Sequence, residues 1–324
     1  MIYVATVHWR STQWIAPQLD YLHRHIAAPF KVFAVLNGIE DRTLWSRFDH
    51  AEDLKAPHGE KLNALARLVV EQARPDDIII FLDSDAFPIR PVDRWLTGSL
   101  EARRFMAVQR RENFGDLRPH PSFCATTVGL WERIGGDWGR EPWTTPTGAV
   151  LDDAGTRVLR SLERCHVDWL PLTRSNTHDA HPLWFGVYGQ HIYHHGAGSR
   201  SKWSGLDDHK VFSEASRHHP SLGSLSKGVR KDPRSLLHLR PGHLAVLPAS
   251  TARSVRQIRK RLLLWSTNRR SERVFHRLTT DPAFYRAFDD SVPDPLPVSG
   301  SDRDRIGPPE RPPGVDRDLR SPTD

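Results

Sequence analysis

The sequence predicts an α/β fold, and three observations lead to this prediction. Strand-like and helix-like segments alternate over the first hundred residues. Segment 78–82 is a strand without a polar residue, and turn-forming residues separate it from the helix before it. Strands linked by helices form right-handed parallel crossovers in a sheet that is covered on both faces. An uninterrupted apolar strand is typical of the middle of such a sheet.

The elements of the N-terminal half follow from local patterns. Leu62, Leu65 and Val69 recur at helical spacing. Asn37-Gly38 is a turn pair that ends a strand, and the turn at 75–77 leads into the apolar strand. These patterns place strands at 3–7, 31–36 and 78–82 and helices at 14–26 and about 59–73.

Beyond residue 100 the expected elements are shorter, and glycine, proline and tryptophan are more frequent between them. Short elements joined by such loops are typical of a region that shapes a substrate pocket. We expect strands at 105–108, 124–128 and 167–170 and a helix from about 153 to 164.

Length and composition are those of a globular protein. A chain of 324 residues can form one large core or two modest domains. No apolar run is long enough to cross a membrane, and no basic leader or cleavage site opens the chain, so we expect a cytoplasmic location. Cys124 and Cys165 lie in no metal-binding or redox spacing and are expected to be packing residues.

The formal net charge of +7 is concentrated in one segment of the chain. Segment 251–277 holds nine Lys or Arg and one Glu, a net charge of +8, which leaves −1 for the rest of the chain. Within it, 253–265 has the pattern of a basic amphipathic helix. Such a helix either contacts an anionic membrane surface peripherally or packs on the rest of the chain with a solvated basic face. Segment 291–324 is rich in proline and charge and is expected to be a disordered tail.

Two carboxylates follow the apolar strand directly. Asp83 and Asp85 are separated by Ser84, and side chains two positions apart in an extended segment point the same way. They can therefore address one cation or one ligand together. The carboxyl ends of strands in open α/β sheets are also where ligands bind, so the sequence predicts a site here.

This stretch, a strand followed by Asp83-Ser84-Asp85 and then Ala, Phe and Pro88, resembles the D-x-D motif of glycosyltransferases with the GT-A fold. The resemblance covers roughly residues 1–210. It implies a Rossmann-type mixed sheet flanked by helices, a nucleotide-diphospho-sugar donor and a divalent cation, Mn²⁺ or Mg²⁺, that bridges the diphosphate. Asp85 is the expected metal ligand, while Asp83 binds the metal or the ribose or sugar of the donor.

A second element of the resemblance comes about 110 residues later. Segment 190–200 has the pattern of a strand that runs into a glycine loop. The family often supplies a late histidine as a further metal ligand, which implies His194 or His195 here, and strand alternation lets only one of them face the metal. Arg200 or Lys202 could neutralise phosphate. The alternative is a buried strand whose histidines hydrogen-bond internally.

Other donor contacts are implied near the opening strands. The segment 58–63 begins a helix whose positive N-terminus suits phosphate. The alternative for this segment is a solvated first turn. The implied donor contacts are Lys61, Asn63, Thr6, His8, Asn37 and Asp41, of which the last two are as well explained as turn formers.

The acceptor side of the expected site has fewer signals. If the enzyme inverts configuration, a carboxylate must take the acceptor proton, and Asp152 or Asp153 stands where the family places it; the alternative is helix capping. The sequence leaves open whether the enzyme inverts or retains. Aromatic or polar residues that could line the acceptor pocket are Trp131, Trp138, Trp143, Asp179, His181 and Trp184.

The expected function is thus a hexosyltransferase or similar enzyme, with an unknown acceptor that is a glycan, a lipid-linked molecule or a small molecule. The expected catalytic domain covers 1–210. Its nucleotide-binding half is 1–100, and its acceptor and metal half is 101–210. A basic, partly helical extension follows at 211–290, and the tail covers 291–324. One alternative is a nucleotidyltransferase or other metal-dependent phosphoryl-transfer enzyme, although the usual glycine-rich phosphate loop is missing from the sequence. The other is a nucleic-acid-binding protein that uses 251–277.

Overall fold

A computed structural model describes residues 1–176, 185–196, 268–281 and 283–284. The chain divides into a compact unit of Met1–Asp289 and a second unit of Asp290–Asp324, and every described residue belongs to the first. Several residues predicted above lie outside the described ones: Asp179, His181, Trp184, Arg200, Lys202, the segment 253–265 and the tail 291–324.

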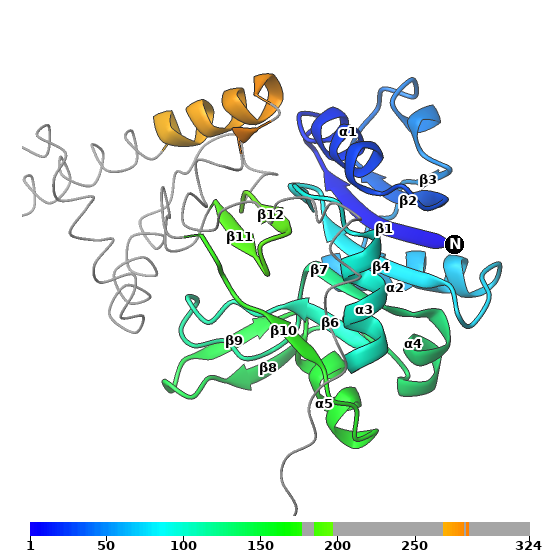
Figure 1. The fold of residues 1–324 in the computed structure, drawn as a ribbon, viewed down its shortest axis with the longest axis vertical. Helices are drawn as coiled ribbons and strands as arrows, with labels where there is room; N and C mark the ends of the chain where they lie inside the picture. The colour runs from blue at the N-terminus through cyan, green and yellow to red at the C-terminus, as the bar shows by residue number, and fades with distance from the viewer. Residues whose placement is uncertain (177–184, 197–267, 282, 285–324) are drawn as a thin grey trace, which may run out of the picture. The chain divides into compact units, whose positions relative to one another are not determined.

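A seven-stranded mixed sheet forms the centre of the first unit (Figure 1). Its order is β10-β6-β7-β4-β1-β2-β3. The strands are β1 (Ile2–Trp9), β2 (Phe30–Asn37), β3 (His50–Glu52), β4 (Ile78–Asp83), β6 (Phe105–Val108), β7 (His120–Thr127) and β10 (Leu170–Leu172). Strand β7 runs antiparallel to both neighbours, and the other pairs are parallel. The predicted α/β class with a mixed sheet is confirmed.

Helices cover both faces of this sheet because alternate residues of the strands face opposite ways. On β4, Ile80 and Leu82 join one buried cluster, while Ile79 and Phe81 join the other. The first cluster includes apolar residues of α1 (Ile15–His25) and α3 (Asp93–Arg103), and the second those of α2 (His58–Val70), α4 (Val128–Ile134) and α5 (Thr156–Arg164). An apolar strand such as β4 is stable only when both faces are covered in this way.

A second, three-stranded sheet lies at the carboxyl end of β4. It has the order β11-β12-β5, with β5 (Ala86–Pro88), β11 (Gly186–Tyr188) and β12 (Ile192–His194). Strand β12 pairs antiparallel with β5, which follows Asp85 directly. This pairing joins segments about 110 residues apart, and the strand β5 was not predicted from the sequence.

The C-terminal part of the first unit contributes a helix. Residues 268–280 are helical, and Val274 and Leu278 are buried in a third apolar cluster with Trp14 and Tyr193. The Tyr21 hydroxyl donates to the carbonyl of Leu278 at 3.0 Å. For this part of the basic segment, packing on the rest of the chain is therefore observed.

The region of 140–172 differs from its predicted elements. Strands β8 (Glu141–Thr144) and β9 (Val150–Asp153) form a hairpin where a loop was expected. Helix α5 begins at Thr156, because Gly155 at φ +112° breaks the helical geometry before it. The strand predicted at 167–170 is β10, shifted to Leu170–Leu172. Other unpredicted elements are η1 (Trp45–Arg47), β3, α3 and α4.

Gly155 and Gly98 should respond oppositely to alanine. A Cβ at Gly155 would lie 2.2 Å from the carbonyl oxygen of Pro119 in a left-handed conformation, so Gly155→Ala should destabilise by about 2–3 kcal/mol. Exposed Gly98 in α3 has open space around it, so Gly98→Ala should stabilise by roughly 0.5–1 kcal/mol through helix propensity. Urea unfolding of both variants measures this. Equal effects would contradict the close approach at Gly155.

Candidate metal centre

Three potential metal ligands converge where β4 ends. Asp83, Asp85 and His194 each offer one ligand atom, and these atoms all lie within 4.8 Å of one another. Nε2 of His194 is 3.6 Å from Oδ2 of Asp83 and 3.5 Å from Oδ1 of Asp85. The side chains of Asp85 and His194 are buried, and that of Asp83 is 19% exposed. Two carboxylates and one imidazole on the rim of a sheet can hold one divalent cation.

The sheet pairing explains how residues so far apart meet. His194 pairs with Ala86 in the antiparallel register of β12 and β5. The backbone N–H of His195 donates to the carbonyl of Asp85 at 2.9 Å. His194 thereby stands beside the two carboxylates.

His195, the other predicted ligand, points elsewhere. Its Nδ1 lies 2.9 Å from the hydroxyl of Tyr193, and its Nε2 lies 2.8 Å from the hydroxyl of Ser271 in the C-terminal helix. Its ring also packs at 4.6 Å, centroid to centroid, from that of Trp14. The cluster of potential ligands includes His194 and not His195, and both ring nitrogens of His195 are engaged, so His194 is the candidate ligand and the expectation for His195 is corrected.

His58 at the start of α2 is a site residue that the sequence reasoning did not single out. Its Nε2 lies 3.0 Å from Oδ1 of Asp83. Burial lowers its pKa, but the hydrogen bond and charge of Asp83, aided by the charge of Asp153, raise it above the ordinary value overall. In turn, burial raises the pKa of Asp83, yet the interactions with His58 and His194 hold it well below its usual range. Asp83 is therefore an ionised carboxylate in the folded protein.

His120 brings a further imidazole to this side of the sheet. Its ring centroid is 6.0 Å from that of His194. Its Nδ1 accepts a hydrogen bond from the backbone N–H of Ser122 at 3.1 Å, so a neutral His120 carries its proton on Nε2. Burial, followed by the charge of Arg110, lowers its pKa well below the ordinary value. As a neutral ring it offers an N–H donor rather than a metal ligand.

The buried side chain of Gln18 supports the turn that carries the two carboxylates. Its Nε2 donates to the carbonyls of Asp83 at 2.8 Å and Ala86 at 2.9 Å. Its Oε1 accepts from the Thr6 hydroxyl at 3.1 Å and lies 3.0 Å from Nε2 of His8. The glutamine on α1 thus ties the end of β1 to the end of β4.

The expected nucleoside contacts of Thr6 and His8 are corrected by this arrangement. Both side chains are completely buried, and the Thr6 hydroxyl and Nε2 of His8 face Gln18. The end of a strand can lie beneath a ligand-binding surface as well as on it, and the sequence does not distinguish the two cases. Both residues contact Gln18, which in turn donates to the carbonyl of Asp83.

Acid should destabilise the protein through His8. Burial lowers its pKa from 6.5 to about 4, although its bond with Gln18 works the other way. Between these pH values the unfolded chain binds a proton that the folded chain excludes. The stabilisation is thus fully present above about pH 6.5 and is lost as the pH falls toward about 4, at a slope approaching 1.4 kcal/mol per pH unit.

Urea unfolding at about pH 7 and about pH 5 checks this. His8→Gln should remove part of the pH dependence, whereas the control His276→Gln, at an exposed position of the C-terminal helix, should keep it. The same pH dependence in the His8 variant and in wild type would contradict the assignment.

Two of the predicted contacts with the sugar donor, Lys61 and Asn37, bond to each other. Nζ of Lys61 donates to Oδ1 of Asn37 at 2.8 Å, and Nδ2 of Asn37 donates to Asp53 at 2.8 Å, so these side chains form one polar group at the carboxyl end of β2. Burial lowers the pKa of Lys61 below its ordinary value, although the charge of Asp53 partly opposes this shift. Asp41 accepts from the backbone and hydroxyl of Thr43, which is the turn-forming role left open above.

Asn63 is used within the protein. Its Nδ2 donates to Oδ1 of Asp137 at 2.6 Å, and its Oδ1 accepts from the backbone N–H of Trp138 at 2.9 Å. It therefore joins α2 to the loop after α4. These bonds give Asn63 a structural use, and its contact with the donor stays a prediction.

Asp152 and Asp153 lie at the exposed end of the hairpin strand β9. Helix capping explains neither, since Gly155 is the N-cap of α5 and no side chain caps it. Asp152 pairs with Arg140 at 3.2 Å, and both side chains are 56% exposed. Asp153 accepts from the N–H of Ala154 at 2.8 Å. Both line a pocket of about 290 Å³ together with His58, whose Nε2 contacts Asp83 of the metal centre.

A buried ion pair fixes the backbone of Asp153. Asp116 receives two hydrogen bonds of 2.9 Å from the guanidinium of Arg118. Nη1 of Arg118 donates to the carbonyl of Asp153 at 3.2 Å and to the hydroxyl of Thr156 at 2.9 Å. Arg118 also lies over the ring of Trp143 at 5.4 Å.

The tryptophans proposed for the acceptor side are mainly structural. Trp131 is 4% exposed and Trp138 is completely buried, and both stack in the core beside Phe81. The expectation for Trp138 is corrected, because no part of it reaches the surface. Trp143 is half-buried on β8 and remains an acceptor candidate. Cys124 is buried and Cys165 partly so, and both are free, in agreement with packing roles.

Similar structures were found, but no similar families. No protein-family model matches the chain, and no curated protein matches it. Solved structures that resemble it include residues 1–349 of TarS from S. aureus with UDP-GlcNAc (14% identity, 42% of this chain and 48% of that chain, TM-score 0.32). Another is the mannosyltransferase PcManGT from Pyrobaculum calidifontis with GDP-Man and Mn²⁺ (11% identity, 90% of this chain and 88% of that chain, TM-score 0.39).

The apo-form glycosyltransferase GlyE of Streptococcus pneumoniae TIGR4 also matches (13% identity, 52% of this chain and 44% of that chain, TM-score 0.34). The chain spans about half the length of the TarS 1–349 chains that it matches. At TM-scores this low the likenesses carry no argument about function, which must come from the site. Among the described residues, no helix is both long and apolar enough to span a membrane.

Proposed function

We propose that this protein is a metal-dependent glycosyltransferase that moves a sugar from a nucleotide-diphosphate donor to an acceptor hydroxyl. One observation carries the proposal: Asp83, Asp85 and His194 converge within 4.8 Å at the carboxyl end of the central strand β4. That edge of an open α/β sheet is where a nucleotide has room to bind. The D-x-D resemblance supplies the reaction class.

The chemistry of the three candidate ligands suits the proposed cation. Two carboxylate ligands and one imidazole suit Mn²⁺ or Mg²⁺ better than a structural zinc, which would take four N or S ligands. When bound, the cation supplies positive charge against the negative charge that develops on the leaving diphosphate. Asp85 and His194 are the proposed ligands, and Asp83 is oriented by His58, so it can bind either the cation or the donor.

The protein's own groups complete the donor site. The N-terminus of α2 at His58 faces the same pocket as Asp153, and a helix N-terminus favours the negative charge of a diphosphate. Lys61 and Asn37 at the end of β2 are proposed contacts of the nucleoside or its phosphates. Arg200 and Lys202, outside the described residues, remain proposed phosphate contacts.

Asp153 is the proposed base if transfer inverts the anomeric carbon. It is exposed, lines the pocket that reaches His58, and has a backbone held by Arg118. Such a carboxylate can take the proton from an acceptor hydroxyl as the new bond forms. Asp152, already paired with Arg140, is the weaker candidate. If transfer retains configuration, Asp153 would instead position the acceptor.

A thermal-shift screen tests the proposal. UDP, GDP, UDP-GlcNAc and GDP-mannose are each added with Mn²⁺ or with a chelator. Binding to the folded state alone stabilises it by about 2.7 kcal/mol at a hundredfold excess over the dissociation constant. We expect at least one nucleotide to raise the melting temperature only when Mn²⁺ is present.

Matched variants locate the effect. Asp85→Ala should abolish the Mn²⁺-dependent shift, while Asp168→Ala, whose side chain is 93% exposed and outside the cluster, should keep it. Nucleotide shifts that are equal with and without metal, or equal in the two variants, would count against the proposal. A cytoplasmic location belongs to the same proposal, and so does peripheral membrane contact through 253–265, which the basic charge pattern of that segment supports.

A further inference from the structure

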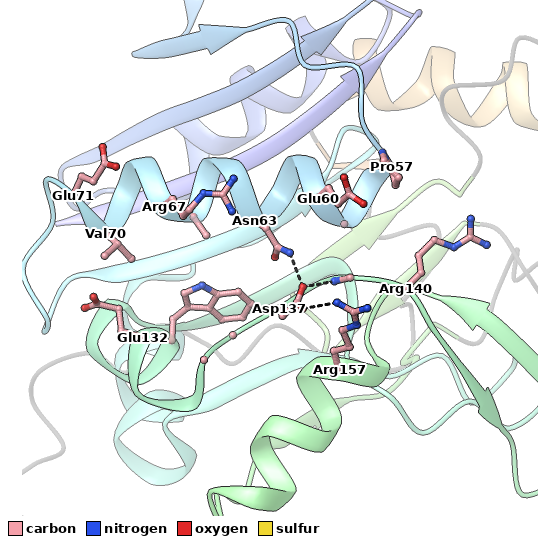
Figure 2. A pocket seen from close by; sticks show the side chains of 16 residues that line it. Pro57, Glu60, Asn63, Arg67, Val70, Glu71, Glu132, Asp137, Arg140 and Arg157 are labelled. Carbon is pink, nitrogen blue, oxygen red and sulfur yellow. Dashed lines mark hydrogen bonds and ion pairs between the residues drawn. The ribbon is translucent and has the colours of Figure 1, made fainter.

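A second, larger pocket lies away from the metal centre (Figure 2). It has a volume of about 720 Å³, within the range of ligand sites. One wall is α2 along its whole length, from Pro57 through Asn63 and Arg67 to Glu71. At a rise of 1.5 Å per residue this wall is about 20 Å long. The pocket is therefore an elongated groove, which we call the α2 groove.

The opposite wall is held rigidly in place. It consists of the end of α4, the loop of 135–140 and Arg157 of α5. Asp137 in that loop accepts from the Asn63 amide at 2.6 Å, from the Gly139 N–H at 2.6 Å and from Arg157 at 2.9 Å. Figure 2 shows the three bonds meeting at Asp137, and the one from Asn63 crosses from α2 to the loop. A groove fixed by such bonds exists before a ligand arrives, which lowers the entropy cost of binding.

One end of the α2 groove meets the proposed reaction centre. Pro57, Gly59 and Arg140 line both the groove and the smaller pocket that contains His58 and Asp153. His58 in turn contacts Asp83 of the metal centre. A molecule that presents one end to Asp153 could thus extend its remainder along α2, away from the metal.

The lining of the groove suits sugar rings. Carboxylates and guanidinium groups both occur along it, and each can make paired hydrogen bonds with neighbouring hydroxyls. The charged residues are Glu60, Arg67, Glu71, Glu132, Asp137, Arg140 and Arg157. Between them half-buried Val70 offers apolar surface for the C–H face of a sugar, and the buried Ala66 and Trp131 lie beneath the lining. The four acids and three arginines give the lining no excess of positive charge, so it has no feature that selects an anionic acceptor.

We propose that the α2 groove binds the acceptor as a linear, uncharged oligosaccharide whose end reaches Asp153. The inference rests on the proposed glycosyltransferase function and names the acceptor class. It predicts that affinity rises with acceptor length, because each added sugar occupies more of the groove. It also predicts that groups at the far end, Arg67 and Glu132, matter only for long acceptors.

Calorimetric titration with oligosaccharides tests this without donor or metal. The probes are gluco-, manno-, galacto- and chito-oligosaccharides from monosaccharide to about hexasaccharide. We expect one series to bind more tightly as the chain lengthens. Arg67→Ala and Glu132→Ala should weaken the longest member about tenfold and leave the monosaccharide unchanged. Arg67 and Glu132 are exposed, so both variants should fold normally.

A matched control is Arg94→Ala, because Arg94 is exposed on α3, on the other face of the sheet. It should bind every probe as wild type does. The inference is overturned if no series binds, or if the groove variants bind the longest probe as wild type does. Because the titration needs neither nucleotide nor metal, its failure is distinct from failure of the donor screen, and either result can occur without the other.

Discussion

Replacing Asp85 by alanine should lower sugar transfer by about a thousandfold while the protein stays folded. The carboxylate and that of Asp83 lie around Nε2 of His194 at 3.5 and 3.6 Å, so removing it takes one of two anionic ligands from a small site. Loss of about 4 kcal/mol of transition-state stabilisation corresponds to that factor. The backbone bond from the His195 N–H to the Asp85 carbonyl does not depend on the side chain and should persist.

The measurement is nucleotide release from the donor that the thermal-shift screen identifies, over a range of Mn²⁺ concentrations. Asp85→Asn should lose nearly as much activity as Asp85→Ala, because an amide keeps the shape but not the charge. Asp168→Asn, at an exposed position, should transfer at the wild-type rate. Activity in Asp85→Ala that high Mn²⁺ fully restores would show a weak ligand rather than an essential one. Activity close to wild type at low Mn²⁺ would contradict the site.

Asp83 should behave differently from Asp85. Asp83 contacts His58 at 3.0 Å, and it is the more exposed of the two carboxylates. We therefore propose that Asp83 can contact the donor as well as the cation, while Asp85, buried beside His194, holds the cation. Strand alternation alone places both side chains on one side and cannot separate these roles.

The sequence predicts the centre of the fold well because its signals are local there. The apolar run that becomes β4, the helical spacing of α2 and the turn at Asn37-Gly38 each specify an element through neighbouring residues. Where local signals conflict, prediction fails. The carboxylates Asp152 and Asp153 suggest a helix cap, yet Gly155 is the N-cap of α5 and leaves them on the strand β9.

The site is predictable to the extent that it is built from motifs. The D-x-D spacing indicates Asp83 and Asp85, and a late histidine is expected, but only the register of β12 on β5 selects His194. His58, Gln18 and Arg118 act through partners that are 25, 65 and 35 residues away in the sequence. No local pattern marks such pairs, since their meaning depends on which strand ends lie together.

The buried pair of Asp116 and Arg118 should be the most sensitive stabilising contact near the acceptor pocket. Both side chains are at most 4% exposed and form two parallel hydrogen bonds. Removing one partner leaves a buried charge without its counter-charge, which lowers the free energy of unfolding by about 3–5 kcal/mol. Arg118→Met or Asp116→Leu alone should therefore unfold at much lower urea concentration than wild type. The double variant should recover much of the loss, because an apolar pair leaves no unpaired charge.

The same pair also fixes the proposed base, and this gives a second readout. Arg118 donates to the carbonyl of Asp153 and to Thr156 at the start of α5. The double variant restores packing without restoring those bonds, so it should fold stably yet show a lower kcat with an unchanged KM for the donor. A double variant with wild-type kcat would mean that Arg118 serves stability alone. If the stability of the double variant also failed to recover, the loss of stability would come from the missing bonds to Asp153 and Thr156 rather than from an unpaired buried charge.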